Sequence, residues 1–192
     1  MLYLVAGLVV FLGAHSVRIF AEGWRSRTVA KLGEKPYKGM LSLVSLFGFV
    51  LLVWGFGVAR ETPIMLWNPP VAMRHIAALL TLIAFVFLAA ANGLPNAIKA
   101  RVGHPMVVAV KTWALAHLMA NGSLAHLILF GSFLVWAVLA FIAARKRDRA
   151  QNVQPVVATT RGTVMAVVVG AVTWALFAFW LHGLLIGVKP FG

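Results

Sequence analysis

Six apolar segments occupy most of this 192-residue sequence, and they constrain its fold more than any other feature. A helix needs about 20 mostly apolar residues to cross a lipid bilayer, and each segment reaches or approaches that length. The sequence therefore predicts an all-α integral membrane protein, a bundle of about six transmembrane helices that forms a single domain over residues 1–192. The expected spans are Leu2–Phe20, Gly39–Val58, Val71–Ala91, Pro105–Asn121, Leu124–Ala144 and Gly162–Val188.

The composition excludes several classes of protein. Hydrophobic residues make up 62% of the chain and charged residues 11%, whereas a soluble domain is about half apolar and about a quarter charged. The chain has no cysteine, which removes disulfides, thiolate nucleophiles, iron–sulfur clusters and covalently attached haem. Its four acidic residues, Glu22, Glu34, Glu61 and Asp148, are too few and too scattered for a carboxylate-bridged di-iron site.

The net charge of +13 is distributed as in a membrane protein and not as in a nucleic-acid-binding one. Most basic residues lie in the first, third and fifth connectors between the apolar segments, and Arg60, Arg74 and Lys189 lie in the opposite ones. Basic connectors remain in the cytoplasm. We therefore expect both termini on the outer, periplasmic side, and the lipid bilayer, not nucleic acid, as the partner.

Six histidines are the main chemically active side chains in or near the predicted spans. Ionisable residues inside a membrane are costly and indicate function. These spans contain no acidic residue and no HExxH sequence. Imidazoles on several helices are the ligand set of haem b, which takes one or two axial histidines in a helix bundle. The alternative is that they pack between helices and donate hydrogen bonds to neighbours. They are His15, His75, His104, His117, His126 and His182.

Two predicted spans carry patterns that suit a haem wall. Trp113, His117 and Asn121 are four residues apart and share one stripe of their helix. This stripe makes His117 a candidate iron ligand, with Trp113 and Asn121 as neighbours in the cofactor site. In the first span, His15 and Arg18 share a face, and Arg18 could pair with a haem propionate. Equally, Arg18 could only mark the cytoplasmic end of its helix.

Depth in the membrane bears on which histidine could be the second ligand. His117 lies near the outer end of its span, whereas His15 lies about 20 Å along its helix from Leu2. Two ligands of one haem must lie at nearly the same depth. Depth alone therefore pairs His117 with His75, His126 or His182.

Several segments of the chain form distinctive motifs. The most distinctive are Gly103-His104-Pro105-Met106 and Lys111-Thr112-Trp113-Ala114-Leu115-Ala116-His117-Leu118, followed by Asn121-Gly122. The others are Leu12-Gly13-Ala14-His15-Ser16, Gly33-Glu34-Lys35-Pro36-Tyr37-Lys38, Leu129-Phe130-Gly131-Ser132-Phe133 and Trp136-Ala137. In these motifs and in their order the chain resembles the NnrU family, and the resemblance covers most of residues 1–145.

The resemblance implies a function and a ligand pair. The family comprises bacterial inner-membrane proteins linked to denitrification. It is similar to the plastid 15-cis-zeta-carotene isomerase, which holds haem b and isomerises a carotenoid in a redox-dependent way. By that likeness, His15 and His117 are the haem ligands. The expected role is a redox-linked accessory factor in nitrogen-oxide respiration or an isomerase of a lipid-soluble polyene, so whether the protein is an enzyme stays open. Expected partners are a lipid-soluble substrate or respiratory membrane proteins.

Two other functions remain as alternatives. One is a membrane scaffold or assembly factor without haem, whose histidines serve packing. The other is a membrane methyltransferase, because His104-Pro105 resembles the Arg-His-Pro element of enzymes that methylate isoprenylcysteine or phospholipids. Here Gly103 replaces that arginine, and the later paired acids of those enzymes are missing. The methyltransferase is the less favoured of the two.

Overall fold

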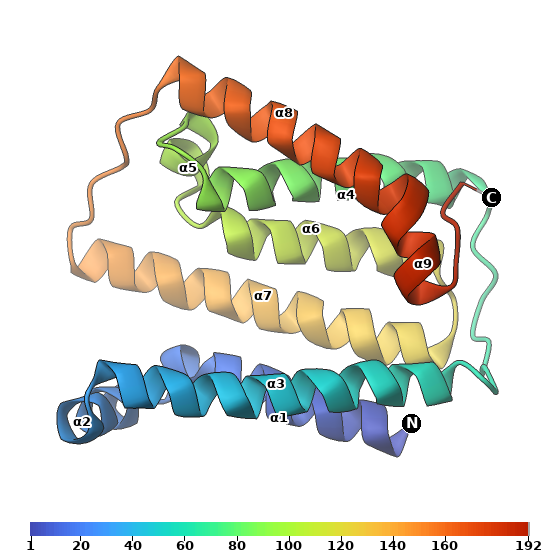
Figure 1. Ribbon diagram of the computed structural model, residues 1–192, viewed down its shortest axis with the longest axis horizontal. Helices are drawn as coiled ribbons and strands as arrows, with labels where there is room; N and C mark the ends of the chain where they lie inside the picture. Colours follow the sequence, from blue (N-terminus) through green and yellow to red (C-terminus); the bar gives the residue numbers. More distant parts are fainter. Residues whose placement is uncertain (192) are drawn as a thin grey trace. The chain divides into compact units, whose positions relative to one another are not determined.

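The computed structural model describes residues 1–191, and it is helical throughout that range apart from turns, connectors and one β-bridge between Met65 and Ser123. Its helices form two compact units, which are described separately below. The elements are α1 (Leu2–Phe20), α2 (Glu22–Leu32), α3 (Glu34–Ala59), α4 (Ala72–Asn92), α5 (Ala97–Val102), α6 (Pro105–Ala120), α7 (Leu124–Ala150), α8 (Thr160–Leu176), the π-helix η1 (Phe177–Leu181) and α9 (His182–Ile186) (Figure 1).

Five helices of the described chain are long and apolar enough to cross a membrane: α1, α3, α4, α7 and the continuous helix Thr160–Ile186. This confirms the all-α membrane fold class. The remaining apolar helix, α6, has 16 residues. At 1.5 Å per residue it is about 24 Å long, less than the roughly 30 Å of a bilayer core. A sixth span and the outward termini therefore stay predictions.

Some helix boundaries differ from those expected. The first charged connector contains a helix of its own, α2, separated from α3 by Gly33, whose φ of +87° favours glycine. Helix α3 begins at Glu34, five residues before the expected start, because a proline such as Pro36 is tolerated in a first turn. Helix α7 continues six residues past Ala144 to Ala150, through arginines and a lysine that favour helix.

The first unit comprises Met1–Asn68 and Gly122–Ala143. Within it, α1 and α3 are in direct backbone contact at glycines. A Cβ atom on Gly48 would lie 2.7 Å from the backbone nitrogen of Phe11, and one on Gly55 would collide with the backbone of Leu4. Small residues allow such close approach of membrane helices. Leu4 is fully buried as a result.

The second unit comprises Pro69–Asn121 and residues 144–191. Here α4 packs against both α6 and α8, and a Cβ atom on Gly170 of α8 would collide with the backbone of Val86 in α4. One turn beyond Gly170, the indole Nε1–H of Trp174 donates a hydrogen bond of 3.0 Å to Thr81 Oγ1. The π-helix η1 follows. The last helix, α9, is capped at its C-terminal end by Gly187, whose φ of +78° is in the left-handed region.

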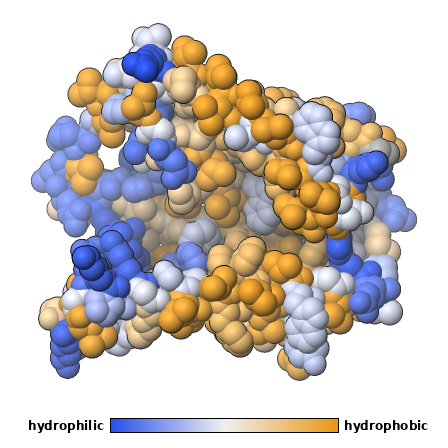
Figure 2. Space-filling view, viewed as in Figure 1, coloured by the Kyte–Doolittle hydropathy of each residue, from blue (hydrophilic) through white to orange (hydrophobic). Residues whose placement is uncertain are grey.

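The outward faces of the helices are apolar. On α3, Leu43 is 70% exposed and Phe47 is 65% exposed, and Leu184 of α9 is 80% exposed. Figure 2 shows apolar residues over the middle of helices and hydrophilic residues gathered mainly near their ends. Large exposed apolar surfaces are typical of contact with lipid, so the fold is that of a multi-pass membrane protein.

Candidate functional site: a histidine-lined cavity

The histidines divide between the two units. His15 of α1 and His126 of α7 lie in the first unit, whereas His75, His117 and His182 lie in the second, together with His104. The ligand pair implied by resemblance, His15 and His117, is therefore split between the units. That pairing stays a prediction.

The stripe predicted on α6 is present. The Nδ1–H of His117 donates a hydrogen bond of 2.9 Å to the carbonyl of Trp113, and the rings of the two residues are 5.2 Å apart. The side-chain amide of Asn121 donates a bond of 2.9 Å to the carbonyl of His117. Helical spacing of four residues thus places an aromatic ring, an imidazole and an amide along one face of α6.

All three residues line a cavity of about 380 Å³ inside the second unit. Its walls come from α4, α6 and the C-terminal segment that begins in α8. The other lining residues are Arg74, Ala77, Ala78, Thr81 and Phe85 of α4, Ala120 of α6, and Trp174, Phe177, Ala178, His182, Val188, Lys189, Pro190 and Phe191 of the C-terminal segment. The cavity therefore combines aromatic walls with two imidazoles and two cationic side chains.

The C-terminal wall is shaped by η1. A π-helix inserts one extra residue per turn and shifts the register of the residues that follow it. After this shift, His182 faces the cavity, and its Nδ1–H donates a hydrogen bond of 2.6 Å to the carbonyl of Val188 beyond Gly187. This turn also brings Lys189 and Phe191 to the cavity wall.

Hydrogen bonding distinguishes the histidines by tautomer. A carbonyl oxygen only accepts, so a ring nitrogen bonded to one carries the proton, and Nε2 carries the lone pair. His117 and His182 have this arrangement. So does His15, whose Nδ1–H donates to the carbonyl of Phe11 at 2.8 Å. Histidines that bind metals through Nε2 are oriented in this way.

The other histidines are held differently. Nδ1 of His126 is 2.6 Å from Ser123 Oγ, a hydroxyl that can donate or accept, so its tautomer is open. Nε2 of His104 is 2.8 Å from the Asp148 carboxylate, which orients that nitrogen as a donor. His75 is exposed on α4 and does not line the cavity.

The surroundings of His15 belong to the first unit. Its ring is 4.4 Å from the ring of Phe11 and 6.2 Å, edge-on, from that of Trp136. Arg18, the candidate propionate partner, is 59% exposed and lies 3.6 Å from Glu22 in an ion pair. An anion bound at Arg18 would therefore compete with Glu22.

Sequence reasoning missed part of the cavity. The sequence indicates only outer flanking charges at Arg74 and Lys189, and it indicates no role for Trp174 and Phe177. The available signal was the distance of eight residues from Trp174 to His182, which is about two turns of a regular helix. The π-helix between them could not be foreseen from composition.

The cavity residues include groups of the kind that hold a haem. In residues 1–191, no group of three or more His, Cys, Asp or Glu side chains is arranged to hold a metal ion. A haem iron takes four ligands from its porphyrin and needs one or two axial side chains. Aromatic walls suit a porphyrin face, and Arg74 and Lys189 suit its carboxylates.

A family model described as NnrU protein matches residues 3–190, nearly the whole chain. No curated protein and no solved structure matches it.

Proposed function

Because the chain belongs to the NnrU family, we propose that it is a haem-b-binding protein of the bacterial cytoplasmic membrane and that His117 is an axial ligand. One observation carries this proposal. His117 presents the lone-pair tautomer of a ligating histidine on the wall of an aromatic cavity that also contains Arg74 and Lys189. A bound haem would supply redox chemistry, together with ligand binding at any open axial position.

The second ligand is His15 or His182. His15 is implied by resemblance, and its ring has the same donation to a backbone carbonyl as His117. His182 is favoured by position, because it lines the same cavity as His117. His15 stays the ligand that the resemblance implies, and His182 is its competitor within the second unit.

The remaining cavity residues position the ligand and exclude water. Trp113 accepts the Nδ1–H of His117 through its carbonyl and so fixes the rotation of the imidazole. Phe85, Trp174 and Phe177 give an apolar wall, which strengthens electrostatic interactions inside the cavity. Arg74 and Lys189 would neutralise the propionates, which is the role that the sequence suggested for Arg18.

The biological role proposed is that of a redox-linked accessory factor in nitrogen-oxide respiration or an isomerase of a lipid-soluble polyene. For either role, His117 would hold the haem at the wall of the cavity, and the haem would supply the redox chemistry. The two roles differ in their substrates. Carbon monoxide binding to the reduced protein would support a site that can admit a ligand, and it would not distinguish the two roles. If carbon monoxide leaves the absorption spectrum of the reduced protein unchanged, the result would instead indicate a closed electron-transfer site.

Single alanine variants of the purified, full-length protein test the ligand assignment. We expect His117→Ala to lose the Soret band and His15→Ala to change the low-spin spectrum. His75→Ala is the matched control, because His75 is an exposed histidine outside the cavity. If the spectrum is unchanged in His15→Ala and changed in His182→Ala, the second ligand is His182 and not His15. Retention of the full spectrum by His117→Ala would contradict the proposal.

A second candidate is a scaffold or assembly factor without haem. One observation favours it: each of His15, His117 and His182 already uses one ring nitrogen to satisfy a nearby backbone carbonyl, as a packing histidine does. In that case the purified protein is colourless even when haem is supplied during expression. The histidine variants then lose thermal stability and no cofactor.

A further inference from the structure

Helix α2 lies at one end of the α1–α3 pair. A single residue separates it from α1 and another separates it from α3, and Figure 1 shows it turned across the ends of those two helices. Both α1 and α3 are long and apolar enough to cross a bilayer. A short helix across their ends therefore lies along the membrane surface, where amphipathic helices contact lipid head groups.

One face of α2 combines an aromatic ring with two cations. At 100° per residue, Trp24, Arg27 and Lys31 fall within an arc of about 60° around the helix. Trp24 is 45% exposed, and Arg27 and Lys31 are exposed as well. None of the eleven residues of α2 is buried. This surface, which we name the α2 face, is therefore open to whatever lies beside the helix.

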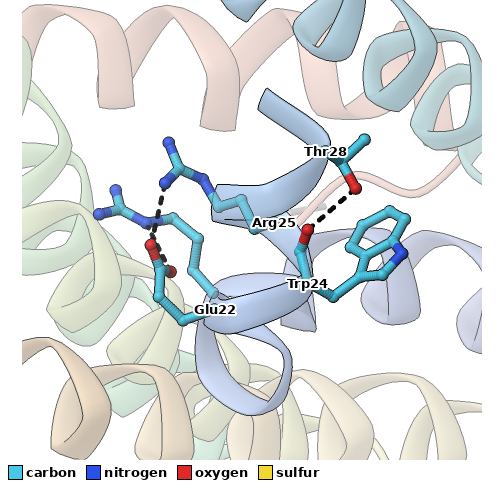
Figure 3. Close-up of polar contacts among 5 residues, drawn as sticks. Glu22, Trp24, Arg25 and Thr28 are labelled. Carbon is cyan, nitrogen blue, oxygen red and sulfur yellow. Dashed lines mark hydrogen bonds and ion pairs between the residues drawn. The ribbon is translucent and has the colours of Figure 1, made fainter. Parts of the chain in front are cut away.

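The acidic residues near the α2 face are already paired with other cations. Glu22 accepts a hydrogen bond of 2.9 Å from Arg25 and forms an ion pair of 3.6 Å with Arg18 (Figure 3). Glu34 pairs with Lys38 at 2.7 Å. Within residues 1–191, no acidic side chain pairs with Arg27 or Lys31. The α2 face thus keeps two positive charges that the protein does not neutralise.

Trp24 is placed to anchor this face at the membrane surface. Its ring is 6.3 Å from the ring of Tyr37 in α3, which fixes one side, and the Thr28 hydroxyl donates 2.9 Å to its carbonyl (Figure 3). Tryptophan rings are enriched at the level of the lipid head groups. A ring at that level would hold Arg27 and Lys31, on the same face of α2, near the lipid phosphates.

We propose that the α2 face binds the head group of an anionic phospholipid. Arg27 and Lys31 are one helical turn apart and provide charge-assisted donors for the phosphate oxygens, and Trp24 covers the glycerol region. Basic residues beside a membrane are attracted to anionic lipids. A zwitterionic lipid carries its own cation, so the two positive charges select against it.

The test uses the full-length protein in bilayers of phosphatidylcholine that contain a minority of phosphatidylglycerol. Spin-labelled versions of the two lipids report how strongly each associates with the protein. We expect the wild type to prefer phosphatidylglycerol and the double variant Arg27→Gln, Lys31→Gln to lose at least about fivefold of that preference. The matched control is Arg101→Gln, Arg161→Gln, which removes the same charge from exposed residues of the second unit and is expected to keep the preference.

Two results would overturn the proposal. The first is an unchanged lipid preference in the Arg27→Gln, Lys31→Gln variant, and the second is an equal loss in the control, which would assign the effect to net charge. If the double variant does not fold, a salt titration of the lipid preference of the wild type tests the proposal instead. Concentrated salt screens exposed charges, so the preference is expected to disappear, and a salt-independent preference would also overturn the proposal.

Discussion

The α1–α3 pair of the first unit and the α4–α8 pair of the second are built from similar apolar helices, and both pairs use glycine contacts. Gly48 and Gly55 bring α3 against the backbone of α1, and Gly170 brings α8 against α4. The α1–α3 contact continues along both helices, from Gly55 beside Leu4 to Gly48 beside Phe11. In the second unit the contact gives way one turn after Gly170 to the ring of Trp174, where the cavity wall begins.

Glycine contacts and aromatic side chains lead to different packing in these two pairs of helices. Glycine allows backbone contact and leaves no space for a ligand, whereas aromatic side chains hold helices apart. The π-helix η1 and the turn at Gly187 then direct His182 and Lys189 to the space that remains. The glycine contact and the cavity wall thus occupy successive stretches of the same helix.

We expect the greatest loss of stability from a substitution at the backbone contact between α1 and α3. Gly48→Leu would place a side chain against the backbone of Phe11, where even a Cβ atom would be 2.7 Å from the nitrogen. We expect a loss of about 3 kcal/mol of stability, as for severe overpacking, measured by circular dichroism melting in detergent. Gly131→Ala is the control, since its Cβ would meet nothing within 4 Å. Equal melting temperatures for the two variants would show that α1 and α3 are not in backbone contact.

A histidine of the first unit provides a second comparison. His126 bonds Ser123 at 2.6 Å and packs edge-on to Phe56 at 5.2 Å, which is a packing environment. We expect His126→Ala to cost about 1 to 2 kcal/mol and to leave the haem content unchanged. The measurements are thermal melting and the haem-to-protein ratio. Loss of haem from this variant would move the ligand role to His126.

The polar contact between His104, before α6, and Asp148 tests how far the second unit depends on polar contacts away from the cavity. Asp148 accepts from His104 at 2.8 Å and lies 3.6 Å from Arg145. Asp148→Asn is expected to lower stability by about 1 kcal/mol, the scale of a partly exposed ion pair. Glu61→Gln serves as the control, because Glu61 is exposed and forms no ion pair within the described chain. A change in the absorption spectrum of Asp148→Asn would show that this pair also acts on the cavity.

We expect the least change in stability at Tyr37 of α3, whose ring lies 6.3 Å from that of Trp24 in α2. Its ring is 3% exposed, and its hydroxyl is buried with no hydrogen-bond partner in the described structure. Removing an unsatisfied buried hydroxyl relieves a desolvation cost, so Tyr37→Phe is expected to be neutral or stabilising by up to about 1 kcal/mol. Tyr3→Phe, at a half-exposed tyrosine, is the control. A destabilised Tyr37→Phe would reveal a partner for this hydroxyl.

The sequence predicted what depends on regular spacing. The apolar runs predicted the helix-rich membrane fold, and the interval of four residues predicted that Trp113, His117 and Asn121 share a face. Pro105 marked the start of α6, as expected for the first helical turn. Each of these features follows from one helix considered alone.

The features that the sequence did not predict depend on irregular backbone or on long-range packing. The sequence did not predict helix α2, because its charged residues are typical of a connector between two spans. The cavity contribution of His182 depends on the π-helix before it, and that of Lys189 depends on the turn at Gly187. Periodicity carries no information on such interruptions, so in the sequence Arg74 and Lys189 indicate only the orientation of the chain in the membrane.

We infer that the cavity of the second unit holds a haem through His117. An absorption spectrum of the detergent-purified wild type, as isolated and after reduction with dithionite, tests it most directly. We predict a Soret band that shifts on reduction and sharp α and β bands, as for haem b with histidine ligands. A protein without a Soret band, even when haem is supplied during expression, would contradict the claim and leave a membrane scaffold with packing histidines.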